Sequence, residues 1–183
     1  MSDIELFPYP ENINRYADKP NDAVRYSLSR DWSSKPRALI IGCNPSKADA
    51  AGDDPTVQWW LKWFFKNGYG GFDVCNLYPF VTQYPSKCRE IACSDEEESN
   101  ENLLHNTRIL KSKAAEASTI FVCWGDIEWD NGHINSTVSE LKSALGKNSQ
   151  LWCWVKNKNG SPRHPSALGK HRIPLSQPAT LWI

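Results

Sequence analysis

The sequence contains none of the short motifs that mark the commonest nucleotide-binding and hydrolytic enzymes. It has no G-x-G-x-x-G after an apolar run, no Walker-type lysine loop and no G-x-S-x-G nucleophile elbow. It also lacks an H-x-E motif combined with C-x-x-C, which disfavours a zinc-dependent deaminase. The sequence therefore does not favour nucleotide hydrolysis, acyl transfer or zinc-dependent deamination.

The chain also lacks an apolar run long enough to span a bilayer, a secretory segment at its start, and a net charge. Lys and Arg number 21 and Asp and Glu number 21, so the total charge does not identify a partner. We expect a cytoplasmic monomer with no membrane partner, no metal and no other cofactor. Its six cysteines should be reduced thiols. Cys88 and Cys93 have C-x4-C spacing but lack a second ligand pair for a metal site.

Two features stand out against this neutral background. The chain contains nine Trp, most of which should lie in the core, although aromatic rings also stack on bases and sugars. Residues 147–183 contain no Asp or Glu but six basic residues, and such a segment can bind a polyanion on one face. These residues are Lys147, Lys156, Lys158, Arg163, Lys170 and Arg172.

Apolar runs alternate with amphipathic segments along the chain, which predicts an α/β fold with a parallel sheet and helices on both faces. We expect one domain over residues 1–183, with an irregular lead-in over 1–22 and an edge strand over 23–32. Residues 157–172 should form a basic loop, with a short helix as one option. The expected core strands are 37–43, 71–80, 118–125 and 149–156, and the expected helices are 55–68, 98–117 and 135–147.

Polar residues follow the ends of the four expected core strands. The strand ends deliver Asn44, Asn76, the turn at 124–126 and the loop that leads to His164. Because ligands of open α/β sheets bind beyond the carboxyl ends of the strands, we expect a polar pocket at this edge.

These residues also have structural interpretations. Asn44 precedes a proline and can start a turn, and a lone histidine in a loop, such as His164, is more often structural than catalytic. Asp54 can cap the helix that follows it. Because one aspartate is enough for a cap, Asp49 and Asp53 are either solvated loop residues or part of the site.

Nearly the whole chain, from "RYSLSRDW" to "SPRHPSAL", resembles the bacterial family called domain of unknown function 1643. The shared pattern is a strand followed by "CNPSKADAAGDDPT", then a helix, "GYGGF" and a strand that ends in "VCNLYPF". The name of that family implies no activity.

The order of the motifs is also similar to that of the uracil-DNA glycosylase superfamily, in particular its mismatch-specific branch. The first motif of that branch, G-x-N-P-G, reads "GCNPS" here, with Ser46 in place of the last glycine. A middle strand ends in a base-reading Asn, which matches Asn76. A later strand that ends in W-G reads "FVCWG", and the last motif, H-P-S, reads "RHPSAL". The resemblance implies a three-layer α/β/α sandwich with a short, mostly parallel central sheet.

The resemblance implies a monofunctional DNA N-glycosylase, which flips a base out of the stack and hydrolyses its N-glycosidic bond to leave an abasic site. Asn44 would position the attacking water, and Asp53 or Asp54 would orient that water or stabilise the cationic sugar. His164 would donate to the base O2 as negative charge develops, and Asn76 would bind the Watson–Crick edge.

The resemblance also suggests which residues touch the base and the DNA. Trp59 and Trp60 are adjacent on a helix and cannot both face the core, so one of them is expected to line the pocket. The base-binding set is Asn76, Ser46, Trp59 and Trp60, and the DNA-binding set is Lys156, Lys158, Arg163, Ser166, Lys170 and Arg172.

Residues 46–51 carry mostly small side chains at the place where strict uracil enzymes hold a bulky aromatic. This leaves room at the pyrimidine C5. We therefore expect a 5-modified pyrimidine as substrate, such as hydroxymethylcytosine or its glucosylated form in phage DNA, and a role in antiviral defence.

Two alternatives stay open. A reader domain would flip and hold a modified base without cutting it, but it would not need Asn44 and His164 together. A hydrolase of free nucleosides or nucleotides could use the same fold, although the basic C-terminal region favours a polymer.

Overall fold

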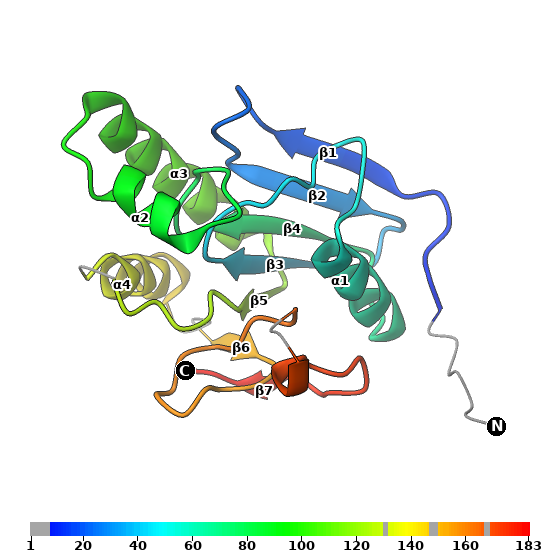
Figure 1. Ribbon diagram of the computed structural model, residues 1–183. Helices are drawn as coiled ribbons and strands as arrows, with labels where there is room; N and C mark the ends of the chain where they lie inside the picture. The colour runs from blue at the N-terminus through cyan, green and yellow to red at the C-terminus, as the bar shows by residue number, and fades with distance from the viewer. Residues whose placement is uncertain (1–7, 130–131, 147–149, 167–168) are drawn as a thin grey trace.

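The computed structural model of the chain describes residues 8–129, 132–146, 150–166 and 169–183. Seven strands form one sheet in the order β1-β2-β4-β3-β5-β6-β7 (Figure 1). The four strands at its centre are parallel to one another, whereas each pairing further out is antiparallel. The central strands are β3 (Arg37–Gly42), β4 (Gly71–Asn76), β5 (Thr119–Val122) and β6 (Leu151–Cys153). The outer strands are β1 (Asn14–Asp18), β2 (Ser27–Asp31) and β7 (Thr180–Leu181).

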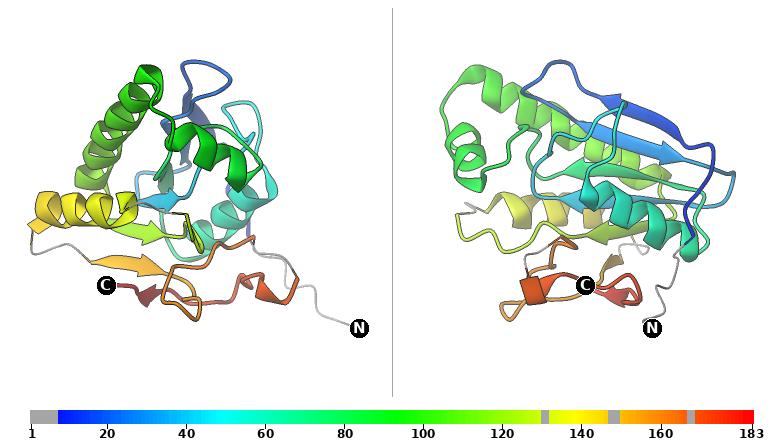
Figure 2. Two further views of the ribbon diagram at one scale, coloured as in Figure 1. Left: turned by 60° about the vertical axis from the view of Figure 1, so that its left-hand side comes forward. Right: turned by 45° about the vertical axis from the view of Figure 1, so that its right-hand side comes forward.

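Helices cover both faces of this sheet. The helices are α1 (Pro55–Lys66), α2 (Pro85–Ala92), α3 (Glu97–Glu116) and α4 (His133–Leu145), with a short 3-10 helix, η2 (Gly169–His171). Figure 2 shows α1 on one side of the sheet and α3 with α4 on the other. None of the helices in the described ranges is both long enough and apolar enough to cross a bilayer.

The continuous apolar sequence of β3 follows from its position between two helical layers. Ala38 and Ile40 pack into the cluster formed with α1, whereas Leu39 and Ile41 pack into the cluster formed with α3 and α4. Successive residues of a strand point to opposite faces, so a strand buried on both faces has no polar alternation.

Helix α1 begins and ends at the residues that typically mark helix termini in a sequence. Asp54 caps its first turn, Pro55 occupies its first position, and Gly68 lies just beyond its end with a φ of 82°. Its buried residues follow helical spacing, which makes one stripe of the helix apolar. These residues are Val57, Trp60, Leu61, Trp63 and Phe64.

The connections between the central strands create a crevice at one edge of the sheet. The chain passes from β3 through α1 to β4 on one side, and then through α2 and α3 to β5 on the other side of β3. At the carboxyl ends of these strands, the loop after β3 therefore leads to one face of the sheet. The loops after its two neighbours, β4 and β5, lead to the opposite face. In doubly wound sheets this switch point is where ligands bind.

The α/β class is confirmed, but the expectation of a mostly parallel sheet is wrong. Three of the six strand pairings are antiparallel. Parallel neighbours need a long crossover, usually a helix. The connections from β1 to β2 and from β6 to β7 contain no α-helix in the parts that the structure describes, and these strands run antiparallel.

The expected irregular lead-in over residues 1–22 is also wrong in part, because β1 lies within it. Consequently β2, which was expected at the edge, lies between β1 and β4. The sequence of β1 is mostly polar and exposed, so it has no apolar alternation to reveal it. Strand β7 and helix α2 were likewise not predicted; α2 has no side-chain cap at its N-terminus.

Candidate functional site

A cavity of about 590 Å³ lies at the carboxyl ends of the central strands. The four strand ends singled out in the sequence all contribute to its wall, through Asn44, Asn76, Trp124 with Asp126, and His164. Further lining comes from the N-terminal half of α1 and from the segment after β4. The volume lies within the range of small-molecule and cofactor sites.

Asn44 is held in a defined orientation at the end of β3. Its Nδ2 donates to the carbonyl oxygen of Thr82 at 2.8 Å and to that of Pro45 at 3.2 Å. The side chain thus ties the first motif to the segment after β4, which is more than a local turn. Because these two bonds fix the amide nitrogen, they also fix the direction of Oδ1, which can accept a hydrogen bond from a ligand or a water.

Asp54 and Ser46 form a second fixed group beside Asn44. Asp54 Oδ1 accepts from the backbone nitrogens of Thr56 and Val57, both at 2.9 Å, and Ser46 Oγ donates to Asp54 Oδ2. The cap interpretation of Asp54 is therefore correct, although the residue also lines the cavity. Its carboxylate has three donors and a defined position.

Asp53 does not line the cavity. Its carboxylate is 2.7 Å from Arg30 Nε and 3.0 Å from Arg15 Nη2, and its side chain is 7% exposed. Asp49 Oδ1 accepts from the backbone nitrogens of residues 51 and 52, as in an Asx turn. Of the two aspartates proposed to act in catalysis, the structure places Asp54 at the cavity and Asp53 in a buried ion pair.

His164 reaches the cavity from the loop after β6. Its Nδ1 accepts from the backbone nitrogen of Ser166 at 3.3 Å, so the neutral ring carries its proton on Nε2. Its ring lies 6.2 Å from that of Trp60, edge to face. Burial lowers the pKa of His164 from 6.5 to about 4, against an opposing effect of Asp54. At neutral pH His164 is an uncharged donor.

This lowered pKa predicts a pH-dependent stability. Between pH 4 and 6.5 the unfolded histidine binds a proton that folded His164 does not, so the free energy of unfolding falls as the pH falls. We expect this residue alone to account for a loss of roughly 2–3 kcal/mol between pH 7 and pH 4.5. Urea denaturation of the wild type and His164→Gln at both pH values measures the difference.

The matched control is His171→Gln, because His171 is exposed. That variant should lose as much stability at pH 4.5 as the wild type does. An equal loss in His164→Gln and the wild type would contradict the prediction.

Asn76 ends β4 with a buried side chain that is 4% exposed. Its Oδ1 lies directly over Gly42, where an added Cβ would approach it to 2.7 Å. Its Nδ2 is buried and has no partner among the described residues. Asn106 on α3 donates to the carbonyl oxygen of Asn76 at 2.9 Å, which fixes its backbone.

The two adjacent tryptophans of α1 have separate positions. Trp60 lines the cavity, whereas Trp59 does not. Trp59 Nε1 donates to the carbonyl oxygen of Ile173 at 3.0 Å, and its ring lies 5.0 Å from that of Trp154. Of the two tryptophans expected to contact the base, the structure thus places only Trp60 at the cavity.

Of the residues expected to contact DNA, only Ser166 lines the cavity. Lys156 Nζ donates to the carbonyl oxygen of Trp182 at 3.0 Å. Arg163 Nε donates to Asn157 Oδ1, also at 3.0 Å. The remaining three are exposed: Lys158, Lys170 and Arg172.

Sequence reasoning missed Arg25, which lines the cavity and is 3% exposed. Its Nη1 donates to the carbonyl oxygens of Ser46, at 3.4 Å, and of Ala48. Burial lowers its pKa to about 10, so the guanidinium stays charged at neutral pH. The residue stood in a segment expected at a sheet edge, where an arginine usually faces water.

Cys43 also lines the cavity, but its thiol is not a nucleophile at neutral pH. Burial raises its pKa to about 12, because the thiolate would lose its solvation. All six cysteines are free. Within the described ranges, no three His, Cys, Asp or Glu side chains are grouped so that they could hold a metal ion.

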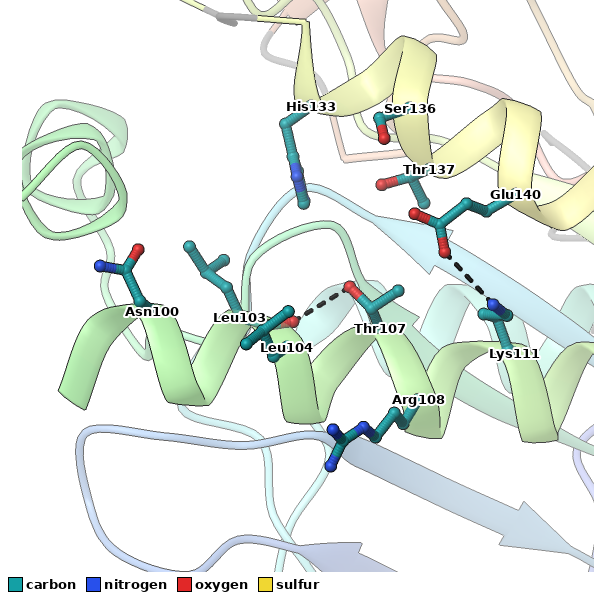
Figure 3. Close-up of a pocket in the computed structure, with 10 residues that line it drawn as sticks. All are labelled: Asn100, Leu103, Leu104, Thr107, Arg108, Lys111, His133, Ser136, Thr137 and Glu140. Atoms are coloured by element: carbon teal, nitrogen blue, oxygen red, sulfur yellow. Dashed lines mark hydrogen bonds and ion pairs between the residues drawn. The ribbon is translucent and has the colours of Figure 1, made fainter. Parts of the chain in front are cut away.

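Two other hollows have larger volumes than the strand-end cavity but differ from it in the polar groups that line them. A groove of about 680 Å³ between α3 and α4 contains the Lys111–Glu140 ion pair at 3.3 Å (Figure 3). A hollow of about 950 Å³ lies near the amino end of β5, beside residues 118–121. Neither is lined by any of the described residues that have a buried polar atom without a partner. The strand-end cavity differs from both in this respect.

The fold and the cavity define an α/β protein with a polar cavity at the switch point of its sheet. The family model described as "Protein of unknown function (DUF1643)" matches residues 25–166, and the chain belongs to this family. The matched range begins at Arg25 and ends at Ser166, so it contains the whole lining of the cavity. Comparisons with curated proteins and with solved structures gave no significant match.

Proposed function

We propose that this protein is a monofunctional DNA N-glycosylase that flips out a 5-modified pyrimidine and excises it, leaving an abasic site. The observation that carries the proposal is the meeting of Asn44, Asn76 and His164 in one cavity. They come from three different strand ends, in the chain order that resembles the uracil-DNA glycosylase superfamily. Helices on both faces of the sheet agree with the layered sandwich of that superfamily.

The chemistry requires a water at C1′ and a stabilised leaving base. As the C1′–N1 bond breaks, its electron pair moves to the base and the sugar becomes cationic. Asn44 Oδ1 accepts a hydrogen bond from the water, whose oxygen then bonds to C1′. The fixed carboxylate of Asp54 stabilises the cationic sugar, and the proton lost by the water ends on the departing base.

His164 stabilises the leaving base as a neutral donor. Its Nε2–H can point to the base O2 while Nδ1 remains bound to the backbone of Ser166. With a pKa of about 4, the ring donates a hydrogen bond without transferring its proton at neutral pH. The buried Nδ2 of Asn76 donates to an acceptor on the Watson–Crick edge.

Moving Asn76 without unfolding the protein tests its part in base recognition. In Gly42→Ala the new methyl group would press on Asn76 Oδ1, the far end of a side chain that can turn aside. We expect base release to fall roughly 10- to 100-fold, while the free energy of unfolding falls by only about 1–3 kcal/mol. Single-turnover base release and urea denaturation measure the two effects.

Gly52→Ala is the matched control, because a Cβ at Gly52 meets nothing within 4 Å. It should release base at the rate of the wild type. Equal rates for both variants would show that the position of Asn76 does not matter.

A second candidate, a non-catalytic reader of modified bases, has one observation in its favour. The carboxylate of Asp54 is already occupied by three donors, and that of Asp126 accepts from Asn159 Nδ2 at 2.6 Å. No other aspartate or glutamate lines the cavity among the described residues. A reader would need no free general base.

The test is a panel of DNAs that contain uracil, a G·T mismatch, hydroxymethylcytosine or glucosylated hydroxymethylcytosine from phage DNA. Mass spectrometry of released bases, with Asn44→Ala in parallel, identifies the activity. A base released by the wild type but not by the variant supports a glycosylase, and release from glucosylated phage DNA supports a role in antiviral defence. Tight binding without release supports the reader, and neither binding nor release rejects both.

A further inference from the structure

Three residues that line the strand-end cavity each carry a buried donor that has no acceptor among the described residues. Six buried side-chain polar atoms lack a partner within the described ranges, and three of them belong to residues that line this cavity. These atoms are Arg25 Nε, Trp60 Nε1 and Asn76 Nδ2, on side chains that are 3%, 5% and 4% exposed. All three are donors, and a buried donor without an acceptor is unfavourable. The matching ligand therefore brings acceptor atoms.

The charges of the cavity indicate that these acceptors are neutral. Arg25 is the buried cation of the cavity, and of the opposite charges that act on it the carboxylate of Asp54 has the largest effect. Both residues line the cavity. His164 adds no charge at neutral pH, and Asp126 is exposed. An anionic ligand would add negative charge to a lining that already holds the carboxylates of Asp54 and Asp126 alongside the guanidinium of Arg25, whereas hydroxyl oxygens accept from the donors at no cost in charge balance.

The position of Arg25 in the cavity indicates which part of the ligand it would contact. Its guanidinium bonds the carbonyl oxygens of Ser46 and Ala48, so it lies against the segment of small side chains after the first motif. In the proposed function this segment faces C5 of the flipped pyrimidine. The unpartnered Nε is therefore on the side of the cavity that would receive a C5 substituent.

We propose that Arg25 is a specificity-determining residue that binds the oxygen atoms of a neutral, hydroxyl-bearing substituent at the pyrimidine C5. This inference rests on the proposed function for the placement of the base. Trp60 Nε1 and Asn76 Nδ2 supply further donors to the same ligand. A methyl group at C5 offers no acceptor, and a carboxyl group brings an unbalanced negative charge.

The test measures binding rather than chemistry, in the Asn44→Ala background, to duplexes with one cytosine derivative each. The derivatives are cytosine, 5-methylcytosine, 5-hydroxymethylcytosine and 5-carboxylcytosine. We expect hydroxymethylcytosine to bind at least about tenfold more tightly than methylcytosine and more tightly than carboxylcytosine. Adding Arg25→Gln should reduce the preference over methylcytosine to about threefold or less.

Two further variants keep the test decisive if Arg25→Gln does not fold. Trp60→Phe keeps the aromatic ring but removes one donor, and it should also lower the preference. Lys47 belongs to the segment that Arg25 contacts, but its side chain does not line this cavity. Lys47→Ala therefore removes a nearby cation and should leave the preference for hydroxymethylcytosine unchanged. Thermal melting of each variant reports folding.

Equal binding of hydroxymethylcytosine and methylcytosine would overturn the inference, as would tightest binding of carboxylcytosine. Base release by the wild type without any such preference would refute this inference and leave the glycosylase standing. A preference that depends on Arg25, without base release from any DNA, would support the inference within a reader and refute the glycosylase.

Discussion

Asn44→Ala is expected to slow the proposed base release roughly 10²- to 10³-fold, because the variant loses the oxygen that would position the attacking water in that mechanism. The amide has one orientation, since its Nδ2 is held by the carbonyl oxygens of Thr82 and Pro45. The variant also loses these two hydrogen bonds, so the free energy of unfolding should fall by about 1–2 kcal/mol. That loss leaves the protein folded at 25 °C and separates the catalytic effect from unfolding.

Single-turnover base release and urea denaturation together measure this prediction. Asn100→Ala is the matched control, because Asn100 is exposed on α3 and does not line the strand-end cavity. It should keep the rate of the wild type. A folded Asn44→Ala variant that releases base within threefold of the wild type would remove Asn44 from the mechanism.

Arg30→Met should produce the largest loss of stability. The side chain of Arg30 is fully buried, and its Nε lies 2.7 Å from Asp53 Oδ1. Its Nη2 also donates to the carbonyl oxygens of Asp49 and Gly52, at 2.6 and 3.3 Å. Its Nη1 donates to the carbonyl oxygen of Ser29 as well, so removing the side chain takes a donor from a buried carboxylate and from three carbonyls, although Arg15 still pairs with Asp53. We expect a loss of about 3–5 kcal/mol, a large part of the typical 5–15 kcal/mol of a domain.

The double variant Arg30→Met with Asp53→Leu distinguishes the buried charge from general loosening of the segment. It should recover part of the lost stability, because neither charge then remains buried alone. Lys19→Met is the control on an exposed pair, where Lys19 Nζ lies 2.7 Å from Asp22, and it should change stability little. A loss in Arg30→Met as small as that in Lys19→Met would contradict the buried ion pair.

The segment between the first motif and α1 connects the stability of the protein with the shape of the cavity. Arg25 binds the carbonyl oxygens of residues 46 and 48, and Arg30 binds those of residues 49 and 52. Arg15 and Arg30 both pair with Asp53. Arginines from β1, β2 and the residues before β2 thus hold in place the segment that carries Ser46 and Asp54. Disturbing them should alter the cavity as well as the stability.

The sequence alone determined the central part of this protein. The continuous apolar run at residues 37–43 favoured a strand covered on both faces, and the Asp54-Pro55 pair began α1 where its apolar stripe started. The meeting of Asn44, Asn76 and His164 followed from the same pattern, since the carboxyl ends of parallel strands lie at one edge of a sheet.

Only the tertiary structure decided which neighbour each side chain would have. Strand β1 forms because β2 offers it an edge, which its own polar sequence does not reveal. Asp53 and Asp54 are adjacent in sequence, yet one meets Arg15 and Arg30 while the other meets Ser46 and the start of α1. Trp59 and Trp60 separate in the same way. Periodicity shows which residues share a face, but the partner opposite that face belongs to a distant part of the chain. That partner determines whether Arg25 is an exposed surface cation or a buried charge in the wall of a cavity.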